Sequence, residues 1–124
     1  MGDRISIQFV NSILPDWYNK SVVLFSHWMG KDLTTKVKIY LTIIGKYDSK
    51  VQTMPFDRRE PQVIMVDFIR WLTKDEDRID GDLHLGFNEN DGDNSDNGHH
   101  IFDLAINKEV KGGKSDDEQD KDNW

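Results

Sequence analysis

The sequence predicts an α+β fold of two layers, in which two helices cover one face of a mostly antiparallel, four-stranded sheet. Two segments near the N-terminus have the apolar patterns of strands, and two later segments have them as well. Between these pairs lie two stretches whose apolar residues recur every three or four positions, as in amphipathic helices. The resulting order, β-β-α-α-β-β, is typical of a layered α+β domain.

The first two predicted strands cover residues 4–10 and 21–28. In the first strand apolar and polar residues alternate, which indicates one buried face. The second strand, SVVLFSHW, is apolar on both faces, so we expect it near the middle of the sheet with Trp28 in the core. A loop rich in turn residues joins them, which favours an antiparallel pair.

The two predicted helices cover residues 31 to about 47 and a segment that begins near Glu60. Pro61 stands in the first turn of the second helix, where proline is favoured. The second helix is apolar over most of its circumference, so we expect it to pack on both the sheet and the first helix. The apolar positions are Leu33, Val37, Tyr40, Leu41 and Ile44 in the first helix, and Ile64, Met65, Phe68, Ile69, Trp71 and Leu72 in the second.

The last two predicted strands cover residues 78–87 and 99–107. Because they follow each other along the chain, we expect the segment 88–98 to be a long hairpin connection between paired strands. Residues 1–110 are then a single globular domain, and residues 111–124 an acidic, disordered tail. The inward-facing residues are expected to be Leu83, Leu85 and Phe87 in one strand, and Phe102, Leu104 and Ile106 in the other.

Composition and charge narrow the function classes. The formal net charge is −7, and the segment 88–98 holds four acids without a basic residue, so a nucleic-acid binder, which needs a basic surface, is not expected. No apolar run is long enough to span a bilayer, and no membrane partner is expected. The absence of cysteine excludes disulfides and thiolate chemistry, which favours a cytoplasmic location.

The acidic segment is the strongest candidate site, because carboxylate and amide oxygens at alternate positions are the ligands that Ca²⁺ prefers. Part of it, DNSDNG, matches the opening of a calcium-binding loop, but the register ends at Leu104 where an EF-hand has a glutamate. The alternative is a solvated loop of turn-forming residues that binds no ion. The candidate ligands are Asp91, Asp93, Ser95, Asp96, Asn97 and Asp103.

A second possible metal site lies on the outer face of the last two predicted strands. Two histidines and two aspartates would suit Zn²⁺ or Mn²⁺ if the strand register brings them together. Chance gathering of polar groups on a solvent face is the alternative. The residues of this set are Asp82, His84, His99 and Asp103.

Three stretches of the chain have distinctive sequences. They are DRISIQFVN; SVVLFSHWMGKDL, which contains FSHW; and REPQVIMVDFIRWLTK together with the loop NDGDNSDNGHH, which contains DNGH. In these stretches the chain resembles a group of small archaeal and bacterial proteins with no established function. The resemblance covers most of residues 3–106 and implies a stand-alone cytosolic protein or one carried by a mobile element. Because the group has no known activity, it implies no functional residue.

These features favour a small acidic binding protein over an enzyme. No nucleophile elbow, phosphate-binding loop or dinucleotide fingerprint is present, and no catalytic residue is indicated. In the leading hypothesis Ca²⁺ is the one candidate cofactor and is held in the 88–98 loop. The alternatives are a metal-dependent enzyme that uses the outer-face histidines and aspartates, and an acidic inhibitor of a basic protein partner encoded by a mobile element. The sequence does not indicate the oligomeric state.

Overall fold

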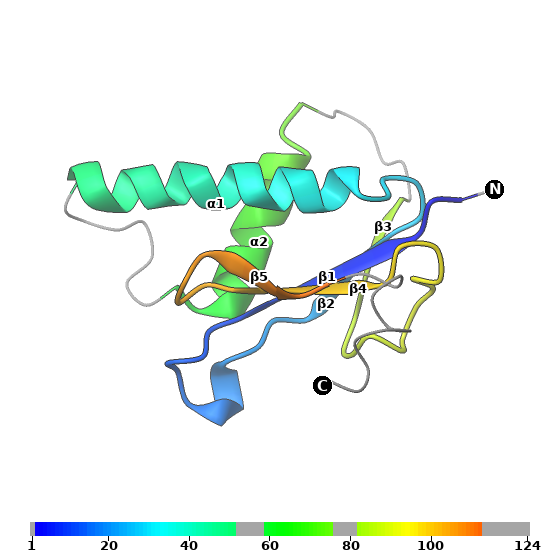
Figure 1. Cartoon of the computed structure of the whole chain (residues 1–124), viewed down its shortest axis with the longest axis horizontal. Coiled ribbons are helices and arrows are strands. Elements are labelled where there is room, and N and C mark those ends of the chain that lie inside the picture. The colour runs from blue at the N-terminus through cyan, green and yellow to red at the C-terminus, as the bar shows by residue number, and fades with distance from the viewer. Residues whose placement is uncertain (1, 52–58, 76–81, 113–124) are drawn as a thin grey trace.

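The protein has a five-stranded mixed sheet with two helices on one face (Figure 1). The computed structural model describes residues 2–51, 59–75 and 82–112. The predicted α+β class is confirmed, whereas the predicted four-stranded sheet is wrong by one strand and in its strand pairing. The elements are β1 (Ile5–Val10), the short 3-10 helix η1 (Asp16–Tyr18), β2 (Val23–Ser26), α1 (Asp32–Val51), α2 (Pro61–Leu72), β3 (Leu83–Gly86), β4 (His99–Asp103) and β5 (Lys108–Lys111).

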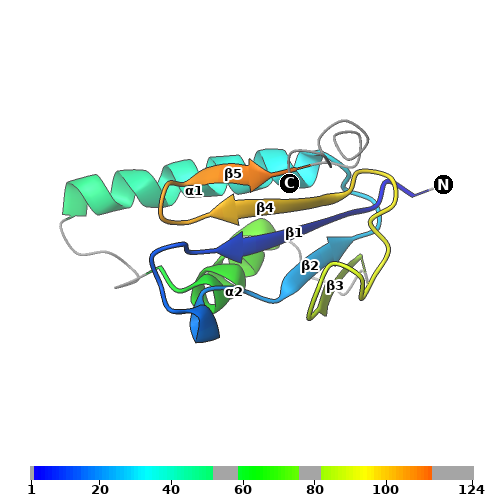
Figure 2. The same cartoon turned by 60° about the horizontal axis from the view of Figure 1, so that its bottom comes forward.

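The strands lie in the order β3-β2-β1-β4-β5, with β1 in the middle (Figure 2). As expected, β1 pairs antiparallel with β2, whereas it pairs parallel with β4. The predicted hairpin between the last two strands is therefore wrong, because β2 and β1 separate β3 from β4. Because β3 and β4 run in the same direction with two strands between them, a tight turn cannot join them, and the long segment after β3 crosses the sheet instead.

The fifth strand, β5, lies just beyond the segment that the sequence predicts as a single strand, 99–107. The chain turns after β4, with Asn107 in the left-handed region at a φ of 54°, and returns as β5 antiparallel to β4. The sequence of β5, KEVK, is charged and lacks the apolar alternation that indicates a strand. An edge strand of this kind gains its stability from the ladder with its neighbour, which no local pattern reveals.

The main core lies between the helices and one face of the sheet. Phe68 of α2 packs edge-on against Phe9 of β1 at 5.7 Å and against Tyr40 of α1 at 5.4 Å between ring centroids. The expected place of the second helix, against both the sheet and the first helix, is thereby confirmed. The core also contains the other buried apolar residues of α1 and α2, together with Ile5, Ile7, Leu24, Phe102 and Leu104 from the sheet and the turn after it.

Four apolar residues expected inside the protein are exposed. Leu85 is 55% exposed, Phe87 is 87% exposed and Ile106 is 55% exposed, while Trp28 beyond the end of β2 is 59% exposed. Alternation along a strand identifies a face, but it does not tell how far the helices extend over that face. Because β3 is at the edge of the sheet, the helices leave its outer part uncovered.

Two predictions fall partly or wholly outside the described residues. The predicted third strand begins at residue 78, and of its residues the structure describes 82 onward, with β3 itself running from Leu83 to Gly86. Of the predicted tail, the structure describes residues 111 and 112, and Lys111 is the last residue of β5. In the described ranges, neither helix has the length and apolar character that crossing a bilayer requires.

Candidate functional site

The acidic segment 88–98 lies on the side of the sheet opposite the helices. The strand register places Ser6 beside Phe25 on one side and beside His99 on the other, so these three residues share that face. Phe25 is fully buried although no helix covers it. Its burial comes from the segment after β3, which crosses this face of the sheet on its way to β4.

Close packing holds the middle of the loop against the sheet. A methyl group added at Gly92 would lie 2.7 Å from the Phe25 ring and 2.7 Å from Nε2 of His84, so glycine is required there for the loop to approach. The His84 ring stacks on Phe25, with 4.8 Å between the ring centroids and 3° between the planes. The loop therefore closes a second, small core on the helix-free face.

A buried polar network ties the loop to β1. Asn94 donates from Nδ2 to Ser6 Oγ at 2.8 Å, and Ser6 Oγ lies 2.7 Å from His99 Nδ1. On the other side of the His99 ring, Nε2 lies 3.3 Å from Gln8 Oε1. A neutral ring fits these partners, with the serine hydroxyl donating to Nδ1 and Nε2–H donating to the glutamine. Burial lowers the pKa of His99 to about 4, which agrees with a neutral ring.

A serine next to a histidine is also the arrangement that nucleophilic catalysis uses. Here Ser6 is fully buried, so its hydroxyl is closed to a substrate. The oxygen already accepts a hydrogen bond from Asn94, and the ring belongs to a strand that pairs directly with that of the serine. The pair therefore serves to join the loop, β1 and β4.

Arg4 holds the far end of the loop. Its Nε lies 3.1 Å from Asp93 Oδ2, and its Nη1 lies 3.5 Å from Asp96 Oδ2. The same Asp96 oxygen accepts a hydrogen bond from the backbone N–H of Arg4 at 3.0 Å. Hydrogen bonds from the backbone and hydroxyl of Ser95 hold the pKa of Asp93 below its usual value, and the charge of Arg4 lowers it further.

Two more carboxylates stabilise local backbone. Asp91 Oδ2 accepts hydrogen bonds from the N–H groups of Phe87 and Asn88 at 2.6 and 3.1 Å. Asp82 accepts from the hydroxyl of Ser26 at 2.8 Å, and also from two backbone N–H groups just beyond β2. Asp91 thus holds the turn that follows β3, whereas Asp82 joins the start of β3 to the end of β2, and these contacts orient both side chains.

The structure brings only part of each predicted ligand set together: Asp93 and Asp96 meet at Arg4, whereas Asp103 lies apart from both. His99 and Asp103 stand at opposite ends of β4, and Asp103 accepts hydrogen bonds from the N–H groups of Ser12 and Ala105, away from the loop. Asp82 and His84 belong to the β3 end of the sheet, and the strands β2 and β1 separate them from β4. Among the described residues, no three His, Asp or Glu side chains gather so that they could hold a metal ion. Cation binding by the loop stays a prediction.

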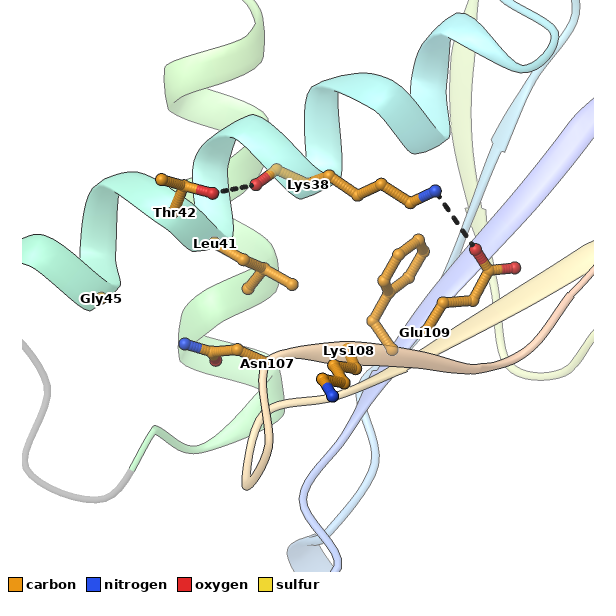
Figure 3. A pocket seen from close by; sticks show the side chains of 8 residues that line it. Lys38, Leu41, Thr42, Gly45, Asn107, Lys108 and Glu109 are labelled. Carbon is orange, nitrogen blue, oxygen red and sulfur yellow. Dashed lines mark hydrogen bonds and ion pairs between the residues drawn. The ribbon is translucent and has the colours of Figure 1, made fainter.

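A pocket of about 430 Å³ lies elsewhere, between α1 and the turn that joins β4 to β5 (Figure 3). At its rim Lys38 reaches toward Glu109, with 3.9 Å between Nζ and Oε1, while the other oxygen of Glu109 lies 2.7 Å from His100 Nδ1. None of the predicted site residues lines it. The lining residues are Lys38, Leu41, Thr42, Gly45, Phe102, Asn107, Lys108 and Glu109.

Comparisons of the chain with protein-family models, with curated proteins and with solved structures found no match.

Three residues that organise the site were missed by sequence reasoning. Arg4, Ser6 and Phe25 lie more than sixty residues before the loop that they hold, in strands where they look like ordinary alternating positions. The parallel pairing of β1 with β4 brings them to the loop. A pairing between distant segments leaves no local pattern, so only an expectation that β4 lies beside β1 would have identified these three residues.

Proposed function

We propose that this protein binds a basic protein partner through the helix-free side of the β3–β2–β1 half of its sheet. We call this surface the acidic face. The observation that carries the proposal is that hydrogen bonds and ion pairs hold four carboxylates of this face in place, those of Asp82, Asp91, Asp93 and Asp96. The acidic face consists of Asp82, Glu89, Asp91, Asp93 and Asp96.

Ordered carboxylates favour binding for a physical reason. A partner that meets a preformed surface does not have to order it, so less conformational entropy is lost on association. Asp93 and Glu89 keep 51% and 44% of their side chains exposed, so their charges are available to a partner. Complementary charge also speeds the encounter of the two proteins.

An exposed aromatic residue next to the acids supports the same function. The backbone N–H of Trp28 donates to Asp82 Oδ1 at 3.0 Å, and the Trp28 ring contacts the ring of His27. The charge of His27 in turn lowers the pKa of Asp93. Trp28 is thus beside the acidic face and exposed. Tryptophan is a frequent anchor in protein interfaces and binds arginine side chains by cation–π contacts.

The test compares two variants with equal net charge. Glu89→Gln/Asp93→Asn removes two charges from the acidic face, while Asp16→Asn/Asp75→Asn removes two exposed charges elsewhere. Each tagged protein captures partners from a cell extract, the captured protein is purified, and calorimetry measures its affinity. We expect the first variant to bind about tenfold more weakly or worse, and the second to bind like the parent chain.

Two results would contradict the proposal. One is that both variants lose the same affinity, which would indicate a response to net charge alone. The other is that a purified partner is acidic or binds with no dependence on either pair of residues. Amide spectra of both variants establish beforehand that the fold is retained.

A further inference from the structure

Among the residues that the structure describes, β3 forms one edge of the sheet, and part of its main chain is directed away from β2, where another chain could pair with it. In the described residues β3 pairs with β2 alone. The N–H of His27 donates to the carbonyl of Asp82, so the main chain of Asp82 faces β2. Because the ladder of an antiparallel pair alternates, the main-chain groups of Leu83 and Leu85 point outward.

The two edges of the sheet differ in protection. The edge strand β5 carries Lys108, Glu109 and Lys111, and a register irregularity interrupts its ladder with β4. Charged side chains and bulges are the devices that keep an edge from pairing with other chains. In β3 no residue is formally charged, and Leu85 and the following Phe87 present exposed apolar side chains.

Acids flank the helix-free side of β3. Asp82 precedes the strand, and Asp91 lies over its other end, since a methyl group added at Gly86 would be 2.6 Å from the Cβ of Asp91. Asp82 and Gly86 are four residues apart, which is about 13 Å along a strand. An extended chain laid along β3 would therefore meet negative charge at both ends and leucine side chains on its other face.

We propose that the outer edge of β3 binds an extended segment of the basic partner as an added strand. The proposal rests on the proposed function and specifies where and how the partner binds. The pattern expected of the segment is basic–apolar–any–apolar–basic. Its two apolar residues lie beside Leu83 and Leu85, and its two basic residues lie beside Asp82 and Asp91. Main-chain hydrogen bonds provide affinity, and the alternating side chains provide specificity.

Charge favours a basic segment over a second copy of the chain at the β3 edge. Two copies could pair their β3 edges antiparallel, with Leu83 of each beside Leu85 of the other. That register would put Asp82 of one copy opposite Gly86 of the other, next to its Asp91. Like charges directly across a strand pair are destabilising, whereas lysine or arginine at those positions is favourable.

The test uses capped synthetic peptides and the full chain. The first peptide has the core lysine–valine–threonine–valine–lysine, and the second has glutamate in place of both lysines. The third is the first with its two valine amides, which would face β3, N-methylated. We expect only the first to shift the amide resonances of residues 83–86, with an affinity at least about tenfold above that of the other two.

A matched pair of variants locates the added strand. Leu85→Pro removes an outward N–H that takes no part in the ladder with β2, so it should abolish peptide binding while the fold persists. Leu85→Val keeps that N–H and should bind within about twofold of the parent chain. If Leu85→Pro does not fold, the N-methylated peptide still separates strand addition from side-chain contact.

Several outcomes would overturn the proposal. Equal binding of the lysine and glutamate peptides, shifts confined to another surface, or unchanged binding by a folded Leu85→Pro variant would each do so. Resonances of β3 that change with protein concentration in the absence of peptide would indicate pairing of two copies instead. A purified partner whose binding depends on Glu89 and Asp93 but not on Leu85 would leave the proposed function standing and refute the added strand.

Discussion

The buried ring of His99 makes stability depend on pH. Its pKa is lowered to about 4 by burial, whereas a histidine in the unfolded chain has a pKa near 6.5. The folded state thus favours the neutral ring, so its contribution is complete above about pH 6.5 and is lost as the pH falls toward 4. We expect the free energy of unfolding to fall by up to about 3 kcal/mol over this window through His99 alone. Urea denaturation at a series of pH values measures this change in the free energy of unfolding.

Replacement of the ring isolates this effect from the carboxylates that titrate in the same range. His99→Gln cannot become charged, so the difference in stability between the two proteins should shrink as the pH is lowered from 7 to 4. His27→Gln changes an exposed histidine just beyond the end of β2 and serves as the control. A constant difference between the parent chain and His99→Gln across this pH range would show that His99 does not titrate in the folded state.

Arg4 supplies a positive charge to two carboxylates of the loop. Its guanidinium contacts oxygens of Asp93 and Asp96, both of which were predicted as calcium ligands. Removing the guanidinium leaves these two charges close together without a counterion, a condition that favours a divalent cation. We expect millimolar Ca²⁺ to raise the Tm of Arg4→Ala more than that of the parent chain, as measured by thermal denaturation.

The carboxylates themselves provide the control for this competition. In Arg4→Ala/Asp93→Asn/Asp96→Asn the extra response to Ca²⁺ should disappear, because the oxygens have lost their charge. The same Ca²⁺ response with and without Arg4 would mean that any ion binds away from these residues. A large response already in the parent chain would favour the calcium loop that the sequence predicted.

At the scale of elements, the fit of the loop on the sheet depends on Gly92. A methyl group there would lie 2.7 Å from both Phe25 and His84, closer than real carbon atoms approach. We expect Gly92→Ala to lower the free energy of unfolding by about 1–3 kcal/mol, the usual cost of overpacking. Chemical denaturation monitored by tryptophan fluorescence gives the value.

Gly45 in the middle of α1 is a matched control. A methyl group there meets its nearest neighbour, Asn107 Nδ2, at 3.6 Å, which is ordinary contact. Since alanine favours helix over glycine, Gly45→Ala should raise stability by about 0.5–1 kcal/mol. If Gly92→Ala were instead as stable as the parent chain, the loop would not pack on Phe25 as described.

The elements themselves differ in how well local sequence predicts them. The helix periodicity placed both helices, and Pro61 marked the first residue of α2, because apolar spacing and backbone constraints act within a few residues. The strand β5 and the partner of β4 were missed, because strand pairing depends on which distant segment is nearby. The loop was recognised as the candidate site, while Arg4 and Ser6, which hold it, were not.

For the whole molecule, the central pair β1 and β4 should be the most stable part. β1 has neighbours on both sides, and the helices cover one of its faces while the loop covers part of the other. We expect amides of β1 and β4 to exchange with solvent most slowly, at the rate of global unfolding, and those of β3 fastest among the strands. Hydrogen exchange followed by NMR measures both.

The loop provides the critical comparison in that experiment. The N–H of Asn97 donates to the carbonyl of Arg4, and that of Gly98 donates to the carbonyl of Asn94. These two amides should be protected nearly as well as β4, whereas a merely solvated loop would exchange within the dead time. Rapid exchange at both positions would remove the basis for an ordered acidic face.

By itself, the sequence determined the class of the fold, the positions of both helices, the face of β1 that meets the helices, and the crowding of carboxylates between residues 88 and 98. Each of these depends on neighbours in the chain, and a periodic or compositional pattern records it. Only the tertiary structure decided that β4 lies parallel to β1, so that the acidic segment is a crossover packed on the sheet and held by Arg4 and Ser6. Pairing across some ninety residues depends on how the whole chain buries its apolar surface, and no short stretch of sequence contains that information.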